Sequence, residues 1–133
     1  MASDNVNIFL SYSGDELPFV RAVADEMRIH GVETWFDQTE IAPGAEWRET
    51  HANALASSKA VVIFIGKAPE SPWMNFEIGA AVGGKKKVVP VFLTQSARKV
   101  APSVLSHFVG IDASDLKPEQ VAERIATAVG TDE

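Results

Sequence analysis

Trp73 and Glu77 are the two residues whose types and spacing most favour chemistry in this chain of 133 residues. They belong to the stretch Ser71-Pro-Trp-Met-Asn-Phe-Glu77. Its serine and proline are typical of a helix start, because proline's fixed φ suits the first turn and its missing N–H is not needed there. In a helix, residues four apart lie one turn above the other on a shared face. The spacing therefore predicts an indole and a carboxylate close together.

The segment just upstream, Ala60 to Ile65, is apolar at every position and is followed by Gly66. A short run of this kind is typical of a strand buried on both faces of a sheet. Trp73 and Glu77 are therefore expected beside the carboxyl end of a central strand.

Strand-like and helix-like segments alternate along the chain. Strands are expected at residues 6–12, 33–37, 60–65, 88–93 and 108–112, and helices at about 19–29, 47–58, 73–83 and 118–129. Residues 94–106 are poorly patterned, with room for a short helix. This alternation predicts an α/β fold: a doubly wound, mostly parallel five-stranded sheet with helices on both faces, in the common order 2-1-3-4-5.

Two details of the pattern can be tested in a structure. Pro90 cannot donate a ladder hydrogen bond, which predicts a position near the sheet edge or an irregularity there. The first helix should also bury the apolar residues that recur at roughly helical spacing, which are Phe19, Val20, Val23, Met27 and Ile29.

The predicted strand order places a switch point between the first and third strands, where ligands bind in doubly wound sheets. The loop after the first strand is Ser11 to Asp15, and the loop after the third runs from Gly66 to Trp73. The loop after the second strand, Gln38 to Glu46, should lie on the same rim and turns at Pro43-Gly44. Topology thus points to the same residues as the chemistry does.

Ile41 is an apolar residue at the tip of this last loop. It could fold back onto its own domain or contact another subunit, and the sequence leaves both open.

Composition excludes several function classes. The formal charge of −6 argues against a nucleic-acid partner, since phosphate binding needs clustered Lys and Arg. The basic run Lys85-Lys86-Lys87 is interpreted as a solvated turn, with a docking patch for an anion as the alternative. No apolar run approaches the roughly 20 residues that span a bilayer. With no cysteine and no leader, we expect a cytoplasmic protein without a membrane partner.

Most standard catalytic signatures are missing. The three histidines stand on separate elements without metal-ligand spacing, so no metal site is expected. The stretch Gly79 to Lys86 has the spacing of a phosphate-binding loop, but it closes a predicted helix and Lys86 replaces the magnesium-ligating Ser or Thr. A phospho-aspartate receiver would need an aspartate at the end of the third strand, where Ile65-Gly66-Lys67 stands.

Three stretches of the chain, taken in order, carry a family resemblance. They are Ile8-Phe-Leu-Ser-Tyr-Ser13; Trp35-Phe-Asp37 leading into Ile41-Ala-Pro-Gly44 with Trp47; and Ser71-Pro-Trp73 with Glu77. Together they resemble the Toll/interleukin-receptor (TIR) domain family, of the kind found in bacteria and plants. The resemblance covers nearly the whole chain and implies a single TIR domain over residues 1–133, with an ordered core from about 6 to 130 and a flavodoxin-like fold. Whether this domain is a piece of a longer multidomain protein is left open by the sequence.

The resemblance also implies an activity. Many TIR domains cleave NAD⁺ and release nicotinamide, leaving ADP-ribose or a cyclised form of it, and their catalytic residue is the glutamate four places after the tryptophan. Here that residue is Glu77. NAD⁺ would be the substrate, no cofactor is implied, and the role would be an effector in bacterial defence or virulence. Other TIR domains are adaptors that signal by assembling with further TIR domains, and this remains the alternative.

The remaining site residues follow from the same resemblance. Trp73 offers a plane for stacking a ring of the dinucleotide, and Ser13 and Gly14 would approach its ribose or phosphates. Phe36 and Asp37 complete the expected substrate-binding set. The loop after the second strand is the usual assembly contact in the family, here Ile41, Ala42, Pro43 and Gly44. We therefore expect activity that rises on self-association, and a sensor domain or subunit outside this chain.

Overall fold

The computed structural model describes residues 7–12, 16–35, 53–66, 72–101 and 103–129. Five strands form one sheet: β1 (Asn7–Ser11), β2 (Glu33–Trp35), β3 (Ala60–Ile65), β4 (Lys87–Phe92) and β5 (Ile111–Asp112). Their order is β2-β1-β3-β4-β5 and every neighbouring pair is parallel. The predicted doubly wound sheet and its strand order are confirmed.

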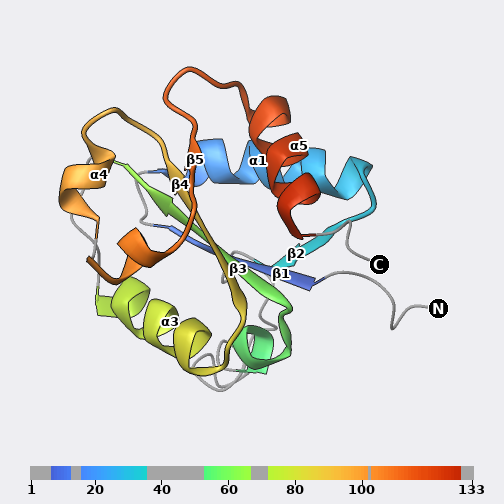
Figure 1. The fold of residues 1–133 in the computed structure, drawn as a ribbon. Coiled ribbons are helices and arrows are strands. Elements are labelled where there is room, and N and C mark those ends of the chain that lie inside the picture. Colours follow the sequence, from blue (N-terminus) through green and yellow to red (C-terminus); the bar gives the residue numbers. More distant parts are fainter. Residues whose placement is uncertain (1–6, 13–15, 36–52, 67–71, 102, 130–133) are drawn as a thin grey trace.

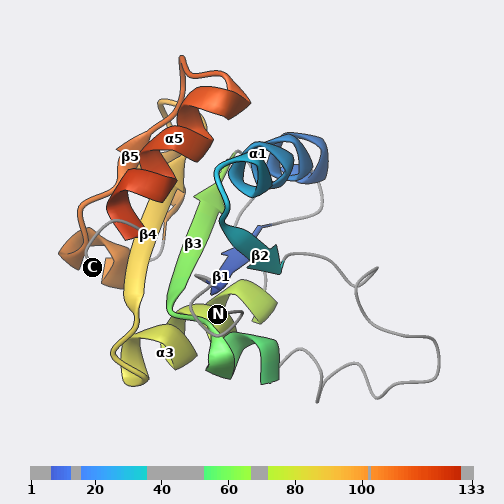
Figure 2. The same ribbon diagram turned by 90° about the vertical axis from the view of Figure 1, so that its right-hand side faces the viewer.

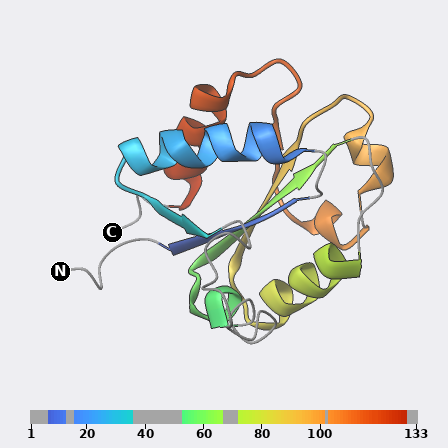
Figure 3. The same ribbon diagram turned by 180° about the vertical axis from the view of Figure 1, so that it is seen from behind.

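Helices cover both faces of this sheet (Figure 1). They are α1 (Leu17–Ile29), α3 (Pro72–Gly83), α4 (Ala97–Val100), the 3₁₀ helix η4 (Ser103–His107) and α5 (Pro118–Val129), with a further helical turn at residues 53–57. α1 and α5 pack side by side on one face, while α3 and residues 53–57 lie on the other, as the view from behind also shows (Figure 3). Seen from the side, β4, β3, β1 and β2 follow one another across the sheet (Figure 2).

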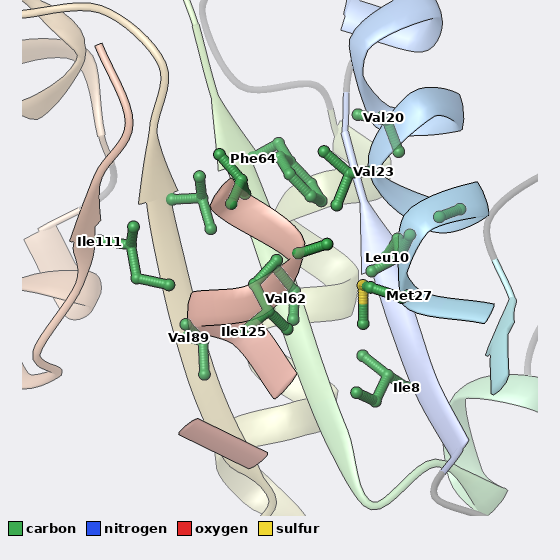
Figure 4. Close-up of a cluster of buried hydrophobic side chains, with 14 of the residues drawn as sticks. Ile8, Leu10, Val20, Val23, Met27, Val62, Phe64, Val89, Ile111 and Ile125 are labelled. Carbon is green, nitrogen blue, oxygen red and sulfur yellow. The ribbon is translucent and has the colours of Figure 1, made fainter. Parts of the chain in front are cut away.

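Alternation along the strands divides the core between these two faces. Ile8, Leu10, Val62 and Phe64 point toward α1 and α5, where Met27 and Ile125 meet them (Figure 4). The alternate strand residues point to the other face and pack against α3 in a second cluster. Its strand members include Phe9, Val61, Ile63 and Ile65, and its α3 members are Ile78 and Ala81. Burying one such side chain contributes about 1.5–3 kcal/mol, so the central strands are held from both sides.

Ile29 departs from the predicted buried stripe of α1. Its side chain is 75% exposed, whereas Val20, Val23 and Met27 are fully buried. Residues two apart in a helix stand about 200° around its axis from one another, so Ile29 cannot share a face with Met27. The prediction that Ile29 belongs to the core was wrong.

Pro90 lies in a strand that is not at the sheet edge, because β4 stands between β3 and β5. β4 is the neighbour of the edge strand β5, which agrees with the predicted position near the sheet edge. Pro90 is in register with Ile63 of β3, while β5 pairs with Val91 and Phe92. The pairing of β5 therefore begins one residue after the proline, and the missing N–H removes no recorded contact with β5.

The basic run after α3 has a structural use. α3 ends at Gly83 and is followed by a turn with a left-handed residue, Lys85 at φ 59°, in which the Lys86 N–H donates to the Ala81 carbonyl oxygen at 3.0 Å. Lys86 Nζ then donates to the carbonyl oxygens of Ala56 and Ser58, at 2.9 and 2.6 Å.

Lys87 caps a helix on the opposite face, because its Nζ donates to the Ala128 carbonyl oxygen in the last turn of α5 at 2.8 Å. The interpretation of the run as merely a solvated turn was incomplete, since two of its three ammonium groups stabilise helix ends. Within the described residues, none of the helices has the length and apolar character needed to cross a membrane.

Candidate functional site

The carboxyl ends of β1 and β3 lie next to each other, since Ser11 of β1 is in register with Ile63 of β3. The chain leaves β1 toward α1 on one face and leaves β3 toward α3 on the other (Figure 1). Divergence of two neighbouring connections to opposite faces is the arrangement at which doubly wound sheets bind ligands. The predicted switch point is therefore present.

α3 carries the two residues from which the sequence argument began. The helix begins at Pro72, so Trp73 is its second residue and Glu77 its sixth, one turn apart. Glu77 immediately precedes Ile78 and stands four residues before Ala81, and both of these are buried against the sheet. The position of Glu77 thus adjoins the stripe of α3 that faces the sheet, while its side chain and that of Trp73 lie outside the described part of the structure.

Glu77 also lies beyond the first turn of α3, which holds no acidic residue. The favourable effect of a helix N-terminus on a carboxylate falls off within that first turn. Complementing the helix dipole therefore does not explain a carboxylate at this position.

The other predicted site residues lie outside the described residues. These are the substrate-binding candidates Ser13, Gly14, Phe36 and Asp37, and the assembly-loop candidates Ile41, Ala42, Pro43 and Gly44. Their nearest described neighbour on the second strand is Trp35, whose ring stacks on Phe9 with centroids 5.1 Å apart and planes at 21°. Both rings lie on the face of the sheet that α3 covers, and their contact helps to hold the end of β2 against β1.

Ser11 is a residue of this region that the sequence argument did not single out. It ends β1, its side chain is only 2% exposed, and its Oγ has no hydrogen-bond partner. A buried hydroxyl without a partner costs about 1–3 kcal/mol. Because Ser11 is two residues from Phe9, it lies on the same face of the sheet as α3. The sequence placed Ser11 at the start of the loop after the first strand, on the predicted ligand-binding rim, but gave its side chain no role.

Glu16 is the second residue that was missed. It directly precedes α1, and its carboxylate packs on the backbone of Gly66 at the end of β3. A Cβ built on Gly66 would lie 2.8 Å from Glu16 Cδ and 3.4 Å from Glu16 Cγ. The distance to Cδ is shorter than ordinary packing allows. Gly66 is thus the residue that lets an acidic group from one side of the switch point reach the other. Nothing in the local sequence pattern reports such an approach.

No three histidine, cysteine, aspartate or glutamate residues gather into a possible metal-binding group within the described ranges. Among the described residues at the switch point are the Ser11 hydroxyl and the Glu16 carboxylate, and the Trp73 and Glu77 positions follow on α3. Hydroxyls and carboxylates bind the hydroxyl groups of sugars readily and provide no positive charge for phosphates.

Comparison with known proteins gives a consistent result. The family model for the TIR domain matches residues 8–126. The NAD(+) hydrolase TcpA of Theionarchaea archaeon (strain DG-70-1) is 27% identical over 97 residues, which cover 68% of this chain and 30% of that protein. The 2′ cyclic ADP-D-ribose synthase AbTIR of Acinetobacter baumannii is 25% identical over 132 residues, covering 92% of this chain and 49% of that protein.

A third relative, the NAD(+) hydrolase PdTIR of Paracoccus denitrificans, is 27% identical over 101 residues, 71% of this chain and 34% of that protein. The chain therefore spans between 30% and 49% of the length of these curated relatives.

Solved structures show the same fold at lower identity. The TIR domain of the Toll-related receptor TRR-2 from Hydra magnipapillata superposes with a TM-score of 0.68 at 14% identity, covering 91% of this chain and 94% of that one. The 2-deoxyribosyltransferase of Bacillus psychrosaccharolyticus gives 0.68 at 14%, covering 88% and 90%. The TIR domains of the activated Roq1 resistosome give 0.64 at 16%, covering 93% and 99%. A receptor and an enzyme share this flavodoxin-like fold, so the fold by itself does not choose an activity.

Proposed function

The chain belongs to the TIR-domain family, and from that premise we propose that it cleaves NAD⁺ between nicotinamide and ribose. The proposal is supported by three relatives that are named as NAD⁺ hydrolases or a cyclic ADP-ribose synthase. The observation that carries it is the placement of Trp73 and Glu77 one helical turn apart on α3, beside the carboxyl end of β3 at the switch point.

A single carboxylate is sufficient for this reaction. The positively charged pyridinium ring of NAD⁺ takes the electron pair of the C1′–N bond and leaves C1′ as neutral nicotinamide. No general acid is therefore needed, whereas an ordinary glycosidase requires two carboxylates. Glu77 stabilises the oxocarbenium-like ribose that remains, as preorganised charge does in other active sites. Trp73 supplies a plane for stacking a ring of the dinucleotide.

Water then adds to C1′ and loses a proton to give ADP-ribose. Cyclisation differs only in that a group of the same dinucleotide attacks C1′ in place of water. The two outcomes share every step up to loss of nicotinamide, so nicotinamide release measures both.

Self-assembly completes the proposal. An apolar Ile41 within the Ile41–Gly44 loop favours contact with a second copy, which would finish the substrate site together with Ser13, Gly14, Phe36 and Asp37. The relatives have additional length beyond the matched region, which leaves room for a sensor domain or subunit. In this proposal the protein is a cytoplasmic effector of bacterial defence or virulence that is silent until clustered.

The test is nicotinamide release from NAD⁺ by the purified protein over a wide range of protein concentration. We compare the parent with Glu77→Gln and with Glu123→Gln, which makes the same change at an exposed position of α5. Parent and Glu123→Gln should release nicotinamide more steeply than in proportion to concentration. Glu77→Gln should be at least about 100-fold slower while unfolding at the same temperature.

Three results would contradict the proposal. Equal rates for Glu77→Gln and the parent would remove Glu77 from the mechanism. Rates strictly proportional to concentration would remove the assembly step. No release even from artificially clustered protein would leave the adaptor alternative, in which Glu77→Gln retains binding to partner TIR domains.

A further inference from the structure

Two buried side-chain hydroxyls have no hydrogen-bond partner within the described residues, Ser11 Oγ and Thr34 Oγ1. They lie on opposite faces of the sheet. Ser11 follows Phe9 on the face that α3 covers, whereas Thr34 is in register with Ile8, whose side chain points toward α1 (Figure 4). The two residues are alike in chemistry and burial and differ in their surroundings.

Ser11 lies at the switch point of the sheet. It ends β1 beside β3, at the switch point, and the Glu16 carboxylate crosses to the backbone of Gly66 at the end of that neighbouring strand. Thr34 stands in the middle of the three-residue edge strand β2, away from this point. A desolvated hydroxyl and a carboxylate from separate elements therefore meet the ends of β1 and β3.

We propose that the Ser11 hydroxyl and the Glu16 carboxylate bind the hydroxyl groups of the nicotinamide ribose. The inference rests on the proposed NAD⁺ cleavage and adds the residues that hold the sugar. A serine hydroxyl both donates and accepts, and a carboxylate accepts, which matches the vicinal hydroxyls of ribose.

Two features favour this sugar over the rest of the dinucleotide. Ser11 lies on the same face of the sheet as α3, which carries Glu77, and the ribose is the group on which Glu77 acts. The Ser11 side chain is already out of contact with water before any ligand arrives. The hydroxyl has therefore lost its hydrogen bonds to water without gaining a partner, and a ligand group that reaches it restores a hydrogen bond in surroundings of low dielectric.

Ser11→Ala tests the hydroxyl, with Thr34→Val as the matched control that removes the other unpaired hydroxyl at nearly constant volume. Neither change removes a hydrogen bond recorded in the unliganded chain, and each removes an unpaired buried hydroxyl, so neither variant should unfold at a lower temperature than the parent. Ser11→Ala should lower kcat/KM for NAD⁺ by about 10- to 100-fold, and Thr34→Val should not change it. Equal kcat/KM values for the two variants would overturn the proposal.

Substrate analogues distinguish a contact from a general disturbance. The parent should discriminate against NAD⁺ analogues that lack the 2′- or 3′-hydroxyl of the nicotinamide ribose, because a polar site is then left without its partner. Ser11→Ala should lose most of that discrimination for one of the two analogues, and Glu16→Gln should weaken it. Undiminished discrimination by Ser11→Ala against both analogues would exclude a contact between Ser11 and this sugar.

Binding of ADP-ribose, measured by calorimetry, separates this proposal from the proposed function. ADP-ribose retains the same ribose after nicotinamide has left. If the parent does not cleave NAD⁺ but binds ADP-ribose about tenfold or more tightly than Ser11→Ala does, the subsite stands and the activity falls. If the parent cleaves NAD⁺ and Ser11→Ala behaves like Thr34→Val in both assays, the activity stands and the subsite falls. A parent that neither cleaves NAD⁺ nor binds ADP-ribose overturns both.

Discussion

At the amino edge of the sheet, where β4 begins, Lys86 and Lys87 donate hydrogen bonds to carbonyl oxygens at the ends of two helices. At the carboxyl edge, where β1 and β3 end, Ser11 keeps a buried hydroxyl without a partner and Glu16 lies against Gly66. The lysines find their partners within the chain, whereas Ser11 retains hydrogen-bonding capacity that a ligand can use. The amino edge therefore holds the fold together, whereas the carboxyl edge is the one at which we propose that a ligand binds.

The comparison predicts the largest loss of stability at the amino edge, for Lys86→Met. Methionine retains the apolar stem but removes two charge-assisted hydrogen bonds to the carbonyl oxygens of Ala56 and Ser58. Because the lysine is partly exposed, we expect a loss of about 2 kcal/mol in the free energy of unfolding. Nicotinamide release per folded molecule should not change. Chemical denaturation and the NAD⁺ assay measure the two quantities.

Lys99→Met is the matched control, because Lys99 is an exposed lysine in the short helix α4. It should change stability by less than about 0.5 kcal/mol. A Lys86→Met variant that kept its stability and lost activity would reverse the roles assigned to the two edges.

The fold could be predicted from the sequence because its signals are local. The apolar run Ala60–Ile65, the Ser-Pro helix start before Trp73 and the turn residues between segments each fix an element, and alternation of elements fixes a parallel sheet. The error at Ile29 came from accepting a spacing of two residues as helical. Family membership could be inferred because three motifs occur in order along the chain. No one of these motifs would have been enough.

The site could be predicted only in part, because its remaining features depend on tertiary contacts. Lys86 and Lys87 looked like a solvated turn because their partners stand 28 to 41 residues away in sequence. Gly66 gave no sign that Glu16 packs on it. Ser11 was placed in the loop at the switch point, but nothing in the sequence indicated that its hydroxyl would be buried without a partner. The roles of Ser13, Gly14, Phe36, Asp37 and the Ile41–Gly44 loop, all outside the described residues, stay predictions.

Gly66→Ala tests the role of the Glu16 carboxylate at the carboxyl edge. The added Cβ would meet the far end of the flexible Glu16 side chain, which can move aside. We therefore expect a stability loss below about 1 kcal/mol and a displaced carboxylate. If Glu16 binds the ribose, kcat/KM for NAD⁺ should fall about tenfold, equivalent to about 1.4 kcal/mol of transition-state stabilisation.

Gly110→Ala is the control that introduces the same methyl group elsewhere. There the new Cβ would lie 2.6 Å from Phe92 Cε2 and 3.0 Å from the Pro90 carbonyl oxygen, and a backbone atom cannot move aside cheaply. Stability should fall by about 1–3 kcal/mol with unchanged activity per folded molecule. If Gly66→Ala instead loses stability like Gly110→Ala and keeps its kcat/KM, the Glu16 contact serves packing and not the substrate.

The smallest effect belongs to Lys85→Gly, which tests whether the amino edge serves stability alone. Lys85 lies in the turn after α3 at φ 59°, a conformation that costs a residue with a Cβ about 1 kcal/mol relative to glycine. Part of that gain is lost to the greater freedom of glycine in the unfolded chain, so we expect a net stabilisation of about 0.5 kcal/mol. The variant keeps the backbone hydrogen bond from Lys86 to Ala81 that closes the helix. A small rise in the denaturation midpoint without any change in nicotinamide release would show that α3 can be stabilised at its carboxyl end without affecting Glu77 near its start. A fall in activity would instead mean that the two ends of α3 are energetically coupled, and the separation of the two edges would fail.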